Sequence, residues 1–140
     1  MYAAGEAHDL RPASQRVIRL VRDGQLDGLI SAEVVQEILH RLVAIRRTEI
    51  GARIARDALD LFAPVLPITH AVMDRMPTLV ESYPELAARD LVHVATCLEH
   101  GLATIVSPDR GFDAVREIRR IDPTDIDEAS PILPANADHD

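Results

Sequence analysis

The segment from Leu86 to Val106 constrains the fold more than any other part of the 140-residue chain. Its amphipathic pattern predicts a helix over Leu86–His100, and Gly101 is a suitable residue to end that helix. A short segment rich in β-branched residues, Ala103–Val106, follows directly and favours a buried strand. A helix that leads straight into such a strand is typical of a parallel sheet covered by helices on both faces.

The same alternation continues through the rest of the chain. Helical patterns are expected to start at Pro12, Ser31, Thr48 and Thr69, and the last should end at Met76 because Pro77 follows. Short apolar strands are expected at residues 28–30, 65–68 and 118–121, with one helical turn around Phe112 and Val115. We therefore predict an α/β fold with a short parallel sheet flanked by helices.

Composition limits the compartment and the kind of core. The chain has two Tyr, two Phe and no Trp, so the core should be aliphatic. Its single cysteine, Cys97, excludes an internal disulfide and fits a reducing cytoplasm, and we interpret it as a small core residue rather than a nucleophile. No apolar run approaches the roughly 20 residues that cross a bilayer. We therefore expect a cytoplasmic protein without a membrane partner.

The net charge of −8 is unevenly distributed. Residues 121–140 contain six acids and no basic residue, so we expect one domain over residues 1–122 and a disordered, acidic, proline-containing tail over residues 123–140. All fifteen basic residues are Arg, for which a GC-rich genome is the simplest explanation. An acidic chain does not bind nucleic acid by charge alone, but a nuclease whose metal ions supply positive charge remains compatible with it.

Acidic residues stand at positions where a carboxylate has a cost unless a cation meets it. Asp90 falls in the first turn of the predicted helix beside its apolar stripe, and Asp109 follows the predicted strand through Ser107 and Pro108. Each has a simpler interpretation, because an acid favours a helix start and an aspartate favours a turn. Glu37 and Glu33 flank the apolar stripe of an earlier helix equally well, and Asp113 lies four residues after Asp109.

Three blocks of sequence contain these acids: SAEVVQEILHR (residues 31–41), RDLVHVAT (89–96) and IVSPDRGFD (105–113). In this order they resemble the PIN-domain family, and in particular the VapC-type toxins of bacterial toxin–antitoxin pairs. The resemblance extends over roughly residues 1–122 and implies a three-layer sandwich with a short parallel sheet. It also implies that Glu37, Asp90 and Asp109 are metal-site carboxylates, that Asp113 is an auxiliary catalytic acid, and that Ser107 is the small hydroxyl residue beside them.

The function implied by this resemblance is that of a Mg²⁺- or Mn²⁺-dependent endoribonuclease, the toxin of a type II toxin–antitoxin system. Such proteins act on RNA, bind a VapB-type antitoxin and form homodimers. The family normally begins with a central strand that ends in an acidic triplet, whereas Met1–Gly5 resembles the segment just after that triplet. We therefore expect the first strand and its Asp to be missing, through a misplaced start or a real loss. With three carboxylates left, weak or absent activity is expected.

Other interpretations remain open at this point. A catalytically impaired PIN-like remnant could still bind antitoxin or partner chains, and would show no carboxylate-dependent Mn²⁺ binding. A receiver-like α/β domain would need an acidic pair after its first strand and a late Lys, and the chain has no Lys. His93 is expected to flank its helix with one hydrogen bond. Five arginines could form a solvated basic face or contact an RNA backbone: Arg41, Arg46, Arg47, Arg53 and Arg56.

Overall fold

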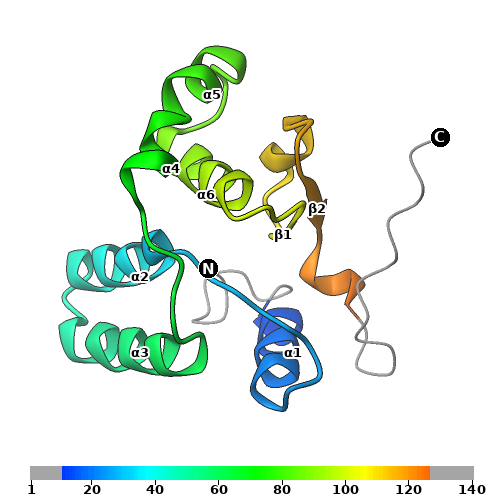
Figure 1. Ribbon diagram of the computed structural model, residues 1–140. Coiled ribbons are helices and arrows are strands. Elements are labelled where there is room, and N and C mark those ends of the chain that lie inside the picture. Colours follow the sequence, from blue (N-terminus) through cyan, green and yellow to red (C-terminus); the bar gives the residue numbers. More distant parts are fainter. Residues whose placement is uncertain (1–10, 127–140) are drawn as a thin grey trace.

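The computed structural model of the protein describes residues 11–126, which form mainly helices around a small parallel sheet (Figure 1). The α-helices are α1 (Arg11–Arg22), α2 (Ala32–Ala44), α3 (Thr48–Leu61), α4 (His70–Asp74), α5 (Met76–Ser82) and α6 (Ala88–Glu99). The strands β1 (Thr104–Val106) and β2 (Arg119–Ile121) alternate with two 3₁₀ turns, η1 (Arg110–Ala114) and η2 (Pro123–Asp125). Within this range, no helix combines the length and the apolar character needed to span a bilayer.

The two strands confirm the predicted α/β class. β1 and β2 pair in parallel, with Thr104 opposite Arg119 and Val106 opposite Ile121. The helix before them ends as expected, since Gly101 adopts a φ of +66° after α6. Thr69 also caps α4 as predicted, accepting a 3.2 Å hydrogen bond from the amide of Val72. The predicted end of this helix at Met76 is wrong: α4 ends at Asp74, and Pro77 lies in the first turn of α5, where a missing amide hydrogen is tolerated.

The strands predicted at residues 28–30 and 65–68 are wrong as extended strands. The structure has only one parallel bridge there, between Ser31 and Leu66. The Leu66 amide donates to the carbonyl of Ile30 and the Leu66 carbonyl accepts from Ala32, each at 2.8 Å. Pro67 has no amide hydrogen, so the ladder loses a donor directly after Leu66, and α2 begins at Ala32 on the other side.

The main core surrounds α6, which lies between the α4–α5 pair and the strands (Figure 1). Leu91, Val94 and Ala95 of α6 are 0% exposed. They pack with residues of α4, α5 and the segment before β2, namely Val72, Met76, Leu79, Tyr83, Phe112, Val115 and Ile118. The partly buried Cys97 packs against the same cluster, as predicted for a core residue, and burial raises the pKa of its thiol. The core is mainly aliphatic, as predicted from composition, but Tyr83 and Phe112 also belong to it.

A smaller core attaches α1 to the end of β2. Leu20 packs with Ile121 and Ile126, and the guanidinium Nε of Arg16 donates a 3.1 Å hydrogen bond to the Ile126 carbonyl. The folded part therefore continues through Ile126, four residues into the predicted tail. The remainder of that tail, residues 127–140, and the predicted N-terminal departure at residues 1–5 lie outside the described residues.

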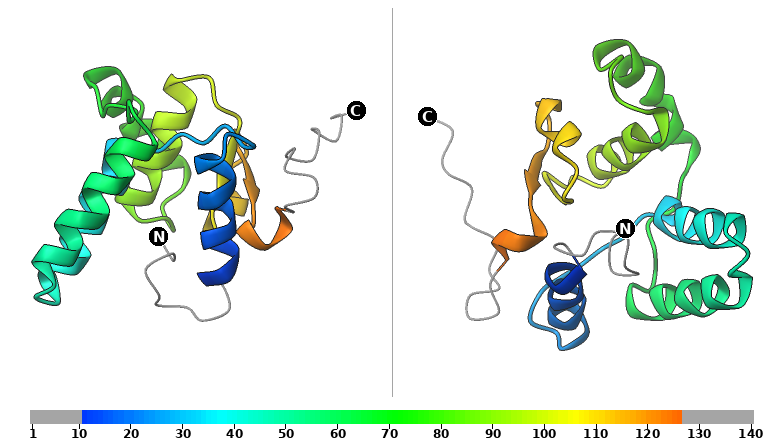
Figure 2. Two further views of the ribbon diagram at one scale, coloured as in Figure 1. Left: turned by 90° about the horizontal axis from the view of Figure 1, so that it is seen from below. Right: turned by 180° about the vertical axis from the view of Figure 1, so that it is seen from behind.

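Helices α2 and α3 form a hairpin to one side of the molecule (Figure 2). Gly51 of α3 permits their close approach, since a Cβ at this position would lie 3.0 Å from the Cβ of Leu42. A cleft of about 850 Å³ lies between the Ser31–Leu66 bridge and β1, with α1 along its side. Most of its lining is apolar, and Leu29 at its edge is 56% exposed. Three of the predicted acids, Glu37, Asp90 and Asp109, line this cleft.

Candidate active site

Three predicted acids come from three different elements and line the same cleft. Glu37 is in the second turn of α2, Asp90 is in the first turn of α6, and Asp109 precedes η1. Because these elements are far apart in the sequence, only the tertiary fold brings the side chains together. We refer to Glu37, Asp90 and Asp109 as the cleft acids.

Asp90 is the least neutralised of the cleft acids. Burial raises the pKa of its carboxyl group above the ordinary value, and the nearby negative charge of Asp109 raises it further. His93 and Arg89 partly oppose this effect, while Glu37 adds to it. Within residues 11–126, Asp90 has neither an ion pair nor a side-chain hydrogen bond. The fold therefore holds like charges near one another, and no side chain within the described residues forms an ion pair with Asp90.

Glu37 has a defined partner, the imidazole of His93. The His93 Nε2 lies 3.2 Å from Oε1 of Glu37, and its Nδ1 lies 3.2 Å from the hydroxyl of Ser31. The hydrogen bond from His93 lowers the pKa of Glu37, although burial acts in the opposite direction. Sequence reasoning expected His93 to make only one hydrogen bond on a helix flank. Its spacing of three residues from Asp90 was the one local signal that it faces the same site.

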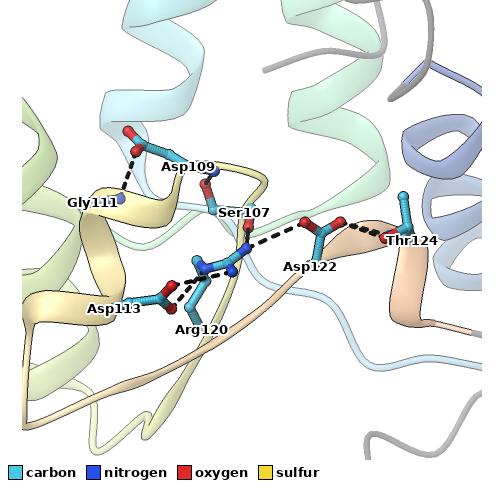
Figure 3. A network of polar contacts seen from close by, with 7 residues as sticks. All are labelled: Ser107, Asp109, Gly111, Asp113, Arg120, Asp122 and Thr124. Atoms are coloured by element: carbon cyan, nitrogen blue, oxygen red, sulfur yellow. Dashed lines mark hydrogen bonds and ion pairs between the residues drawn. The ribbon is translucent and has the colours of Figure 1, made fainter.

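Asp109 is held by the loop that leaves β1. Its amide donates to the Ser107 hydroxyl at 3.1 Å, and its Oδ1 accepts from the amide of Gly111 at 2.8 Å (Figure 3). A Cβ at Gly111 would lie 3.1 Å from that same oxygen and 3.1 Å from a methyl carbon of Leu86, so glycine permits this tight turn. Ser107 thus shapes the loop that presents Asp109.

Asp113 is not brought together with the cleft acids. Arg120 of β2 donates to both of its carboxylate oxygens, at 2.8 and 3.3 Å, and this bond lowers the pKa of Asp113. Arg120 also donates to Asp122 at 3.3 Å and to the Ser107 carbonyl at 3.0 Å. In Figure 3 the Asp109 carboxylate lies on the opposite side of the loop. We refer to Asp113, Arg120 and Asp122 as the Arg120 cluster.

The geometry of η1 explains this separation. The sequence-based interpretation placed Asp113 one turn after Asp109, which applies to an α-helix with 3.6 residues per turn. Residues Arg110–Ala114 instead form a 3₁₀ helix, in which residues three apart share a face and residues four apart point about 120° away from each other. Asp113 consequently faces β2.

The cleft acids supply oxygen donors, which suit hard divalent cations such as Mg²⁺ and Mn²⁺. Among residues 11–126, however, no three His, Cys, Asp or Glu side chains lie close enough together to form a ready-made metal site. Mg²⁺ is commonly bound by one or two carboxylates and retains several waters. The mutually repelling pair Asp90 and Asp109 fits this kind of site.

The predicted arginines do not form one surface around the acids. Arg41 lines the cleft, whereas Arg46 and Arg47 form the turn at the far end of the α2–α3 hairpin. Arg53 and Arg56 are exposed on α3. Arg89, which was not predicted, lines the cleft next to Asp90.

Comparison with known proteins identifies the family to which the chain belongs. The model of the PIN domain matches residues 4–118. The chain belongs to the PIN-domain family. It is 35% identical to Ribonuclease VapC13 of Mycobacterium tuberculosis and, equally, to VapC ribonuclease Mb1869c of Mycobacterium bovis, over 86% of this chain and 92% of each relative. It is 30% identical to Ribonuclease VapC23 of Mycobacterium tuberculosis, over 78% of this chain and 86% of that relative. No solved structure matches the protein.

Proposed function

We propose that the protein is a metal-dependent endoribonuclease and the toxin of a toxin–antitoxin pair. The observation that carries the proposal is that Asp90 and Asp109 line one cleft and have no ion-pair partner among residues 11–126. The names of two relatives indicate that the substrate is RNA, because both are called ribonucleases and the match covers 92% of each. We also propose that the protein acts on RNA in the cytoplasm.

In this proposal Asp90 and Asp109 would hold Mg²⁺ or Mn²⁺, and Glu37 would accept a hydrogen bond from a water near the cation. A divalent cation in such a site makes a bound water nucleophilic and stabilises negative charge on a phosphodiester. Arg41 and Arg89 line the same cleft and would bind RNA phosphates on either side of the acids. Arg46, Arg47, Arg53 and Arg56 would contribute only with RNA that extends along the α2–α3 hairpin.

Partners are part of the same proposal. A VapB-type antitoxin would inhibit the enzyme, and a segment that places a cation among the cleft acids would block the metal and the substrate together. A second copy of the chain is the remaining proposed partner, as expected for a toxin that acts as a homodimer.

One observation favours a second candidate, a PIN-like remnant that binds partners without cleaving RNA. Within the described range, no ready-made cluster of three metal-ligating side chains exists. A protein of this kind would retain antitoxin binding and lose catalysis. The two candidates make opposite predictions for the same metal-dependence experiment.

The experiment is RNA cleavage by the full chain with Mg²⁺ or Mn²⁺ and with excess EDTA. We expect cleavage that requires the metal and that falls by at least about 100-fold in Asp90→Asn, a larger loss than the ten- to 100-fold of an outer-shell residue. Asp122→Asn, in the Arg120 cluster, is the matched control and should cleave normally. Cleavage that persists in EDTA or in Asp90→Asn would contradict the proposal. A folded wild-type protein that never cleaves but binds antitoxin would favour the remnant.

A further inference from the structure

His93 connects two elements through a chain of hydrogen bonds that starts at the Ser31–Leu66 bridge. The Ser31 backbone is fixed because its neighbours Ile30 and Ala32 both bond to Leu66. Ser31 is the N-cap residue of α2, yet its hydroxyl makes no capping hydrogen bond and lies 3.2 Å from the His93 ring instead. At 7% exposure this hydroxyl needs a partner inside the protein, and His93 provides it.

The two ring nitrogens of His93 have different tasks. An ionised Glu37 carboxylate can only accept a hydrogen bond, so the Nε2 of His93 carries the hydrogen. The Nδ1 then faces a serine hydroxyl, which can donate to it or accept from it. Ser31 therefore provides a partner for Nδ1 while Nε2 bonds to Glu37. Side-chain exposures of 14% for His93 and 30% for Glu37 place this bond at the edge of the cleft.

We propose that His93 is a positioning residue, which holds the Glu37 carboxylate beside Asp90 and Asp109 so that it bonds to water around a bound divalent cation. The inference rests on the proposed metal site. His93 occupies Oε1 of Glu37, and within residues 11–126 the structure records no partner for Oε2. This oxygen is the one left to accept from water. Both ring nitrogens of His93 are engaged, so the ring is not free to bind the cation itself.

The role is of the same kind as that of outer-shell groups in metalloproteins, which fix the orientation of a ligand without touching the metal. Removal of His93 leaves Glu37 free to rotate, and two buried or half-buried polar groups lose a partner. The cation then loses an oriented water acceptor. Its affinity should fall while the ligands Asp90 and Asp109 remain in place.

The test is Mn²⁺ binding to the full chain, measured by electron paramagnetic resonance of the free ion, with thermal unfolding as a check of folding. His93→Leu keeps the approximate volume and removes both hydrogen bonds, and we expect it to weaken Mn²⁺ binding by about tenfold or more. His93→Gln can place an amide donor near the Nε2 position and should restore most of the affinity. His40→Leu, at the other histidine that lines the cleft, should leave binding unchanged.

A double-mutant cycle identifies the route of the effect. In a Glu37→Gln background, His93→Leu should cause no further loss, because the carboxylate it positions is gone. An equal loss in both backgrounds would overturn the inference and indicate that His93 acts as a ligand or on the fold. Unchanged binding in His93→Leu, with binding abolished by Asp90→Asn, would overturn the inference alone. Absence of Asp90-dependent binding in the wild type would overturn the proposed metal site and this inference with it.

Discussion

Two groups of acidic residues, the cleft acids and the Arg120 cluster, differ in how their charge is balanced. The Asp109 carboxylate and the Arg120 cluster lie on opposite sides of the loop Ser107–Asp109 (Figure 3). In the Arg120 cluster, one guanidinium bonds to Asp113 and Asp122, and the pKa of each carboxyl is lowered. For Asp122 the larger causes are the amide and hydroxyl of Thr124. Among the cleft acids, burial and the charge of Asp109 raise the pKa of Asp90.

The difference shows which acids have charge left for an external cation. The acids of the Arg120 cluster already pair with a cation of the protein, the Arg120 guanidinium. Arg120 also donates a hydrogen bond to the Ser107 carbonyl and so connects β2 to that loop. Asp90 and Asp109 repel each other across the cleft without such a partner among residues 11–126. The acids that pair with Arg120 of β2 thus stabilise the fold, whereas the cleft acids, which do not pair with it, fit a metal site.

The largest expected effect is on the rate of RNA cleavage, when one acid from each side of the loop is replaced. Asp109→Asn should reduce Mg²⁺-dependent RNA cleavage by at least about 100-fold, since a proposed ligand is lost rather than an outer-shell group. Asp113→Asn should leave the rate near that of the wild type, because its carboxylate is committed to Arg120. Initial rates at saturating Mg²⁺ measure both. Equal losses would mean that the two groups of acids form one site.

A smaller effect is expected on stability when the arginine is removed. Arg120→Ala should lower the free energy of unfolding by about 1 kcal/mol, mainly through the bond to the Ser107 carbonyl, because solvent screens the two ion pairs. Urea denaturation at pH 7 measures this change. Arg53→Ala, at an exposed arginine of α3, is the control for the general cost of truncating an arginine. If Arg120→Ala costs no more than the control, the cluster does not stabilise the fold.

The smallest effect has the opposite sign and concerns Asp90. A raised pKa means that the folded state disfavours the charged carboxylate, so stability is reduced above the folded pKa and the penalty is relieved as the pH falls through it. Asp90→Asn should therefore increase the free energy of unfolding at pH 7 by about 0.5 kcal/mol, a small value because solvent screens a half-exposed charge.

The pH dependence makes this prediction specific. The difference between Asp90→Asn and the wild type should disappear as the pH falls to the ordinary value of 3.8 for an aspartate. Urea denaturation at a series of pH values measures it. A decrease in stability at pH 7 would show that the Asp90 carboxylate has a stabilising partner, contrary to its place among the cleft acids.

Local patterns were sufficient for the elements that depend on neighbouring residues. The helix around Leu91, its end at Gly101 and the following strand were predicted because amphipathic spacing, glycine and β-branched residues act within a few positions. The placement of Asp90 and Asp109 at one cleft was expected from the same helix and strand, combined with the resemblance to the PIN-domain family.

Features that depend on distant residues were not predictable in this way. The strand expected at residues 65–68 fails because pairing needs a partner ladder, and Pro67 removes a donor. Asp113 was misplaced because the sequence does not distinguish a 3₁₀ turn from an α-helical one. The bond between His93 and Glu37 joins residues 56 positions apart, and no local pattern indicates it.

The most direct test of the account is the stoichiometry of Mn²⁺ binding to the full chain by isothermal titration calorimetry, with one substitution on each side of the loop. We predict saturable binding to the wild type and to Asp113→Asn, and no binding to Asp90→Asn. Binding that survives Asp90→Asn and is lost in Asp113→Asn would place the cation in the Arg120 cluster and contradict the account.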